Sequence, residues 1–167
     1  IVEPIVYHTH PIYLNVILCA KNSKEIINDI LDLYEYDYIK YHSPGKDLCD
    51  NFYKSPDKKI VLLENHGLIC CGESFKEVFD LSLKINQLCK EWLIANAKTF
   101  KTFNTKLTKK RTDCFLFPDA VVLPSDNLQI NNYILHIQEE VGLEPNCLTK
   151  EEIIKLQNME AEKYRMK

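Results

Sequence analysis

In the first third of the chain, the spacing of apolar residues alternates between the pattern of a β-strand and that of an α-helix. The β-branched and aromatic run 1–10 predicts a strand that ends at the proline after it. Residues 14–18 and 23–33 carry apolar side chains at threes and fours, which predicts two short helices. Alternation over 36–41 predicts a short strand, and the apolar positions within 48–53 predict another helix.

The middle of the chain gives the clearest indications of regular structure. Residues 60–63 are uniformly apolar, which is typical of a buried strand, and 67–71 follow as a second strand after a sharp break. From 74 to about 100, apolar residues recur at threes and fours, so we expect a long helix with one face packed on the sheet.

The sequence becomes polar and basic over 102–113, after this helix, which predicts a linker to a second part of the chain. Residues 115–118 indicate an extended apolar arm, while 126–141 and 149–165 indicate helices, the second opened by a Thr-Lys-Glu-Glu run that is similar to a capping box. We therefore expect a mixed α/β domain over 1–101, followed by a polar linker and a helical C-terminal extension over 102–167.

Composition and charge narrow the class of protein. The chain has 167 residues, 46% of them apolar, so it can bury a core and is too apolar for intrinsic disorder. A formal net charge of −3 gives no basis for general nucleic-acid binding, and no apolar run approaches the roughly 18–20 residues of a membrane span. Seven cysteines without a C-x-x-C pair or a secretory leader predict reduced, mostly buried thiols and a cytoplasmic location.

Three of the five histidines are spaced for metal binding. His8 and His10 stand two apart in the first predicted strand, so both imidazoles project from one face. His66 follows the buried strand 60–63 and precedes Gly67, where we expect a tight turn. Three imidazoles with an open fourth position form the donor set of a catalytic zinc site, and a polar cleft lined by histidines is the alternative.

Three short runs together resemble the class II aldolase and adducin family. They are Tyr-His-Thr-His-Pro at 7–11, Tyr-His-Ser-Pro-Gly at 41–45 and Leu-Leu-Glu-Asn-His-Gly-Leu at 62–68. The runs occur in the family's order and at about its distances, and the long helix predicted from 74 takes the place of the family's helix after the third histidine. The resemblance covers roughly residues 1–100.

The resemblance implies a three-layer α/β/α sandwich in which His8, His10 and His66 bind Zn²⁺ or another divalent metal. Enzymes of this family cleave or rearrange small sugar phosphates, which implies a zinc-dependent, aldolase-type lyase acting on a small phosphorylated ketose. A divalent metal suits that reaction because, as a Lewis acid, it takes up the negative charge that aldol cleavage develops. An epimerase or dehydratase with the same metal site is one alternative, and a non-catalytic, adducin-like oligomerisation or protein-binding module is another.

The resemblance does not supply a complete active site. Family enzymes place their acid/base glutamate before the His-x-His strand, whereas only seven residues precede His8 and Glu3 stands at the wrong distance. We therefore expect either that a segment precedes Ile1 in the native protein or that the chain is not a competent aldolase. Glu64, two before His66, is the remaining carboxylate of interest, as an acceptor for a ligand imidazole or a proton shuttle. A capping or pairing role at the sheet edge is the alternative for Glu64.

Aromatic residues bear on assembly. Tyr34, Tyr36 and Tyr38 alternate along one short stretch, and aromatic side chains are enriched in protein interfaces. They favour a closed homo-oligomer like the tetramers of the family, with the zinc within reach of a neighbour's C-terminal segment, although rings that complete the core would explain them as well. His136 stands among apolar residues of a predicted helix, and we expect it on that helix's surface or partly packed.

Overall fold

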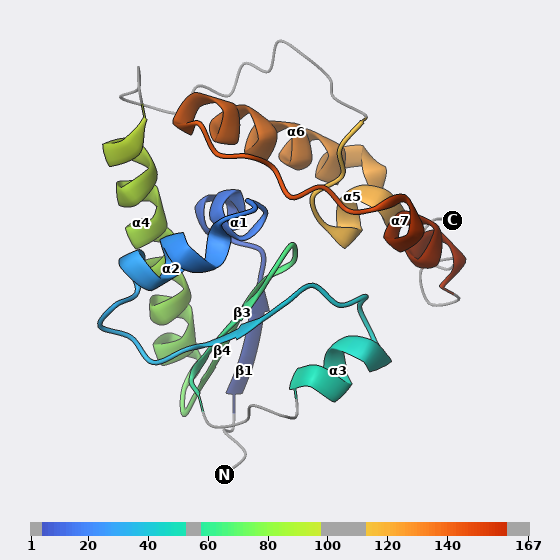
Figure 1. The fold of residues 1–167 in the computed structure, drawn as a ribbon. Coiled ribbons are helices and arrows are strands. Elements are labelled where there is room, and N and C mark those ends of the chain that lie inside the picture. The colour runs from blue at the N-terminus through green and yellow to red at the C-terminus, as the bar shows by residue number, and fades with distance from the viewer. Residues whose placement is uncertain (1–4, 53–57, 98–112, 160–167) are drawn as a thin grey trace.

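A four-stranded sheet lies at the centre of the computed structural model, which describes residues 5–52, 58–97 and 113–159 (Figure 1). The strands are β1 (Ile5–Thr9), β2 (Asp37–Ile39), β3 (Ile60–Leu63) and β4 (Gly67–Gly72). They lie in the order β1-β4-β3-β2, with β4 antiparallel to both of its neighbours and β2 parallel to β3. The hairpin of β3 and β4 therefore forms the middle of the sheet.

Helices cover both faces of this sheet. The described ranges contain α1 (Ile12–Leu18), α2 (Ser23–Ile30), α3 (Lys46–Phe52), α4 (Phe75–Asn96), α5 (Pro118–Val122), α6 (Pro124–Val141) and α7 (Lys150–Asn158). Helices α1, α2 and α4 lie on one side of the sheet and α3 lies on the other, while α6 packs on α1 (Figure 1). The predicted three-layer α/β/α fold with a helical extension is confirmed.

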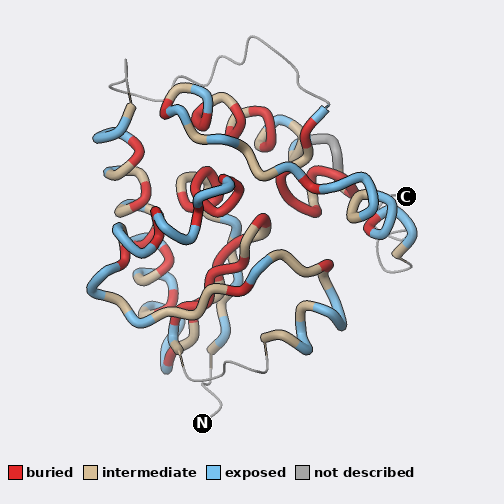
Figure 2. The backbone as a smooth tube through the Cα atoms, viewed as in Figure 1, coloured by how far each residue is buried: buried red, intermediate tan, exposed pale blue. Residues whose placement is uncertain are grey.

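The main core surrounds α1, whose residues from 14 to 18 are buried without exception (Figure 2). Leu68 of β4 and Ile85 of α4 pack in this core from the sheet side. Leu116 and Ile134, which belong to the C-terminal extension, lie in the same core and are fully buried. The extension is thus held by apolar burial, the dominant stabilising term in folding.

The second face of the sheet has a smaller apolar cluster. Ile39, Val61 and Leu63 point away from α1 and are covered by Leu48 and Phe52 of α3. Alternation along β3 explains the division, since consecutive side chains of a strand point to opposite faces. This thinner layer leaves room beside α3 for a pocket.

Several element boundaries differ from those that the sequence predicts. The long helix begins as expected at the cap Ser74, whose hydroxyl accepts a hydrogen bond from the Glu77 amide, but it ends at Asn96 and Ala97 is extended. The expected end near Phe100 lies outside the described residues. The predicted capping box at the start of α7 is confirmed, yet that helix ends at Asn158, and 160–165 also lie outside the description.

The expectation that all the cysteines are reduced thiols is wrong for two of them. Cys114 and Cys147 form a disulfide, with their Cα atoms 5.2 Å apart, across a separation of 33 residues. The other five cysteines are free. The bond joins the start of the apolar arm to the segment that precedes α7, a proximity that only the folded extension creates.

The tyrosines at 34, 36 and 38 lie against the main core and are partly buried there. The hydroxyl of Tyr38 lies 2.5 Å from that of Ser23, so this ring has a local role in packing.

No helix within the described ranges is long and apolar enough to cross a membrane.

Candidate metal centre

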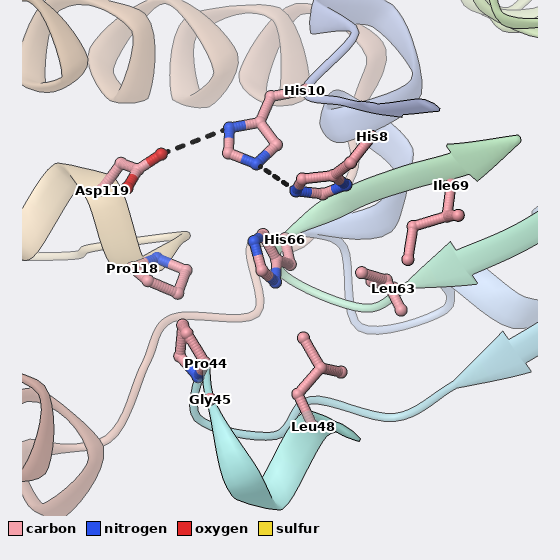
Figure 3. Close-up of a pocket in the computed structure, with 10 residues that line it drawn as sticks. All are labelled: His8, His10, Pro44, Gly45, Leu48, Leu63, His66, Ile69, Pro118 and Asp119. Atoms are coloured by element: carbon pink, nitrogen blue, oxygen red, sulfur yellow. Dashed lines mark hydrogen bonds and ion pairs between the residues drawn. The ribbon is translucent and has the colours of Figure 1, made fainter. Parts of the chain in front are cut away.

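The three histidines singled out in the sequence converge on one spot at the edge of the sheet (Figure 3). His8 lies in β1, His10 follows β1 directly, and His66 lies in the turn between β3 and β4. One ring nitrogen from each lies within 4.8 Å of the others. The ring centroids are 4.8 to 5.1 Å apart. Such a group can hold a metal ion.

Alternation in β1 aims His8 at this spot. Its neighbours Tyr7 and Thr9 point to the other face, where the Thr9 hydroxyl lies 3.0 Å from the Ser82 hydroxyl of α4. Because successive strand residues face opposite ways, His8 points to the α3 side of the sheet. His10 lies just past the strand, before α1, and its Nε2 is 3.0 Å from that of His8.

The turn that carries His66 is shaped by the residue before it. Asn65 has a φ of 54°, in the left-handed region that asparagine tolerates better than most residues. The backbone of His66 is fixed on both sides, because its amide donates to the Leu63 carbonyl at 3.1 Å and its carbonyl accepts from the Asn15 amide group at 3.1 Å.

The C-terminal extension also holds this turn. The side-chain amide of Asn65 donates to the carbonyls of Leu116 and Asn146, each at 2.6 Å, and accepts from the Asn146 side chain at 2.8 Å. Asn65 is buried, so losing these partners would leave polar groups unsatisfied. The position of His66 therefore depends on residues of the extension, which follow much later in the chain.

A close approach at Gly67 completes the support of the site. A Cβ atom at this position would lie 2.5 Å from the Thr9 carbonyl oxygen and 2.7 Å from Cδ2 of His10. Both distances are too short for any side chain, so only glycine lets the His10 ring lie against the start of β4.

Two of the rings already use the nitrogen that points away from the site. His8 Nδ1 lies 2.9 Å from the Leu68 carbonyl, which can only accept, so this nitrogen carries the proton. His10 Nδ1 lies 3.3 Å from the Asp119 carboxylate. When both rings are neutral, two Nε2 lone pairs therefore face each other at 3.0 Å, and a cation between them removes the repulsion.

The ring of His66 also has a nitrogen that a metal ion could satisfy. Nδ1 of His66 is buried and has no hydrogen-bond partner among the described residues. Burial and the two neighbouring histidines lower the pKa of His66 to about 3, and desolvation together with His10 lowers the pKa of His8. Rings kept neutral in this way offer lone pairs to a metal, so the residues present fit a divalent ion.

A pocket of about 360 Å³ opens above the histidines. Pro44 and Leu48 line it from the α3 side, Leu63 and Ile69 from the sheet, and Asp119 from α5 (Figure 3). Among the residues that line it, Asp119 carries the carboxylate and none is a lysine or arginine. The C-terminal residues at the pocket belong to this chain's own extension; a contribution from a neighbouring chain stays a prediction.

Glu64 points elsewhere. Its carboxylate accepts hydrogen bonds from the Tyr38 hydroxyl at 3.0 Å and from the Tyr41 amide at 3.1 Å, and it does not line the pocket of the histidines. The reason is that β3 ends at Leu63, so the alternation that would align Glu64 with His66 does not continue. These contacts agree with the alternative role of Glu64, pairing at the sheet edge.

The sequence by itself assigns no role to Asp119. Pro118 at the first position of a helix was an available signal, since proline is favoured there and the following acidic residue suits a helix start. The five-residue helix α5 is too short to show a periodic pattern, and nothing local relates it to His10.

Parts of the chain are similar to two known proteins. A Bacillus subtilis (strain 168) protein named "Uncharacterized oxidoreductase YuxG" is 29% identical over 103 residues, which are 59% of this chain and 15% of that protein. The Drosophila melanogaster "Protein hu-li tai shao" is 45% identical over 38 residues, 23% of this chain and 3% of that protein. The chain thus matches a small part of the length of each relative.

The family comparison covers more of the chain. The model of the class II aldolase and adducin N-terminal domain matches residues 4–93, more than half of the sequence, and this range contains all three histidines of the site. The chain belongs to the class II aldolase and adducin N-terminal domain family.

Proposed function

We propose that the chain is the metal-binding part of a zinc-dependent, aldolase-type lyase that acts on a small phosphorylated ketose. The observation that carries the proposal is the facing pair of His8 and His10 nitrogens, 3.0 Å apart, with His66 beside them. Four tetrahedral ligands at the usual zinc–nitrogen distance of about 2.0–2.1 Å lie roughly 3.3 Å from one another. The His8 and His10 nitrogens are close to that separation, while the ligand atoms of the trio lie within 4.8 Å of one another, so His66 must approach the pair.

Each residue has a definite task in this proposal. The Leu68 carbonyl holds His8 with Nε2 toward the pocket, and the buried turn holds His66. A bound divalent ion would polarise a substrate carbonyl as a Lewis acid. The apolar walls at Leu48, Leu63 and Ile69 would exclude water around the reacting carbons, which strengthens electrostatic effects there.

The substrate class follows partly from the pocket and partly from the family. A volume of about 360 Å³ suits a small molecule. The phosphate is an expectation from the family alone, because the residues that line the pocket include no cationic side chain. The assay therefore has to test the ketose and the phosphate separately.

Proton exchange tests the proposal without a known aldehyde partner. Aldol cleavage of a ketose 1-phosphate leaves a three-carbon fragment that must take up a proton at the carbon beside its carbonyl. The reverse of that step removes the proton again, so an aldolase exchanges it with solvent even when no aldehyde is present. We expect zinc-loaded protein to exchange that proton of dihydroxyacetone phosphate in D₂O faster than zinc in buffer but slowly, because Glu64 faces away from the pocket and cannot serve as the base. The exchange is followed overnight by NMR. Unphosphorylated dihydroxyacetone, incubated in parallel, measures what the phosphate contributes.

The controls fix the assignment. His66→Ala should abolish the exchange, while His136→Gln, a change of a half-buried histidine in α6 away from the site, should leave it intact. Exchange by wild type no faster than zinc in buffer, or equal exchange by His66→Ala, contradicts the proposed function.

A non-catalytic oligomerisation or protein-binding module is the second candidate. The observation that favours it is an exposed apolar row on α4, where Phe75, Phe79 and Leu83 are 60%, 38% and 53% exposed. Either function is compatible with the proposed homotetramer. Light scattering at micromolar concentration tests the assembly, and a mass near 19.5 kDa would exclude it.

A further inference from the structure

Asp119 brings a carboxylate to the histidine cluster from outside the sheet. Its Oδ2 lies 3.3 Å from Nδ1 of His10, on the side of the ring opposite to the pocket nitrogen (Figure 3). The side chains are 19% and 32% exposed, so the contact is partly screened from solvent. The two groups stand 109 positions apart in the sequence, and the fold of the extension brings them together.

The backbone that carries Asp119 is fixed before the helix begins. The Leu116 amide donates to the Asn131 side chain at 2.8 Å, and Asn131 donates in turn to the Cys114 carbonyl at 2.9 Å. Leu116 itself is fully buried in the main core. The disulfide at Cys114 ties the same segment to the stretch before α7. Because its backbone is held in this way, the Asp119 carboxylate can fix the orientation of the His10 ring.

We propose that Asp119 is the positioning residue of the metal centre and sets the tautomer of His10. This inference rests on the proposed metal site and adds the C-terminal extension to it. An acceptor at Nδ1 keeps the proton there and leaves Nε2 bare toward His8 and His66. Without that acceptor the neutral ring is free to carry its proton on Nε2, where it would block metal binding.

The first test reads the tautomer directly in metal-free protein. Long-range ¹H–¹⁵N spectra at alkaline pH, where the rings are neutral, should show His10 of the wild type protonated at Nδ1, with the signal assigned by His10→Gln. In Asp119→Ala we expect a mixture of both tautomers. In Asp119→Asn the amide oxygen still accepts, so the Nδ1-protonated form should persist.

The second test measures zinc affinity by competition with a chelator. Loss of a carboxylate that supports a ligand histidine typically costs about 10–100-fold in affinity, and we expect that loss for Asp119→Ala and a smaller one for Asp119→Asn. Asp126→Asn, the same change of charge at an exposed position of α6, is the matched control and should bind like wild type.

Several outcomes would overturn the inference. An unchanged tautomer and unchanged zinc affinity in Asp119→Ala would exclude any positioning role. Equal losses in Asp119→Ala, Asp119→Asn and Asp126→Asn would show an effect of net charge instead. Failure of the exchange assay in the wild type would reject the lyase while leaving both of these measurements decisive, so the two proposals fail separately.

Discussion

Replacing Gly67 by alanine tests how tightly the histidine site is built. The added methyl group would lie 2.5 Å from the Thr9 carbonyl oxygen and 2.7 Å from Cδ2 of the His10 ring. The first neighbour is backbone of β1 and the second is a ring wedged beside His8, so neither can move without a change in the site. We therefore expect the substitution to push the His10 ring away from its position beside His8.

The size of the displacement follows from these contacts. An ordinary van der Waals contact begins at 3.4 Å, so the methyl group and the His10 ring must separate by about 0.7 Å. Metal–ligand distances are tolerant only to about 0.2 Å. We expect Gly67→Ala to weaken zinc binding by at least roughly 10-fold, the lower bound for damage to a supporting group. Overpacking should also cost about 1–3 kcal/mol of stability.

Two measurements on each variant check this reasoning, urea unfolding and zinc affinity. Gly72→Ala is the matched control, because it lies in the same strand and its methyl group would meet the flexible end of Glu77 at 2.8 Å, away from the histidines. It should lose some stability and keep its affinity for zinc. Normal zinc affinity in a folded Gly67→Ala protein would refute the close packing of His10 against β4.

Two further predictions concern the thiols and the extension. Burial raises the pKa values of Cys70 and Cys89 to about 12, so a disulfide reagent should modify the exposed Cys49 quickly in native protein and these two only after unfolding. Unfolded, unreduced protein should then titrate five thiols, and seven would disprove the disulfide. Leu116→Ala should cost about 2–5 kcal/mol in urea unfolding because its side chain is fully buried. Ile154→Ala, at a site 56% exposed, should change stability by less than about 0.5 kcal/mol, and equal losses would contradict the shared core.

The sequence is most informative where local pattern decides structure. The uniformly apolar run 60–63 is buried on both faces as β3, and β4 follows at once, so the pattern of apolar residues is enough to place His66 in a turn. The spacing of His8 and His10 likewise indicates neighbouring rings, whose centroids lie 4.8 Å apart.

Features that depend on distant segments could not be predicted. The contact of Asp119 with His10 requires the route of the whole extension through the core, and the pattern of apolar residues says only that the extension has an apolar side. The pairing of Cys114 with Cys147 is of the same kind, since seven cysteines allow many pairings.

The case of Glu64 has a different cause. A strict alternation continued from β3 would put Glu64 and His66 on one face, but Asn65 takes a left-handed conformation, which asparagine tolerates and which the hydrogen bonds to Leu116 and Asn146 hold in place. Local preference and tertiary contacts thus act together at the turn, and extrapolation of the strand period across it fails.

The zinc content of purified protein tests the central claim most directly. Wild type, His66→Ala and His136→Gln, each supplied with zinc and then dialysed, would be compared by elemental analysis. Three convergent imidazoles predict one zinc per chain in the wild type and in His136→Gln, and almost none in His66→Ala. Equal zinc in wild type and His66→Ala would contradict the assignment of His8, His10 and His66 as the metal ligands.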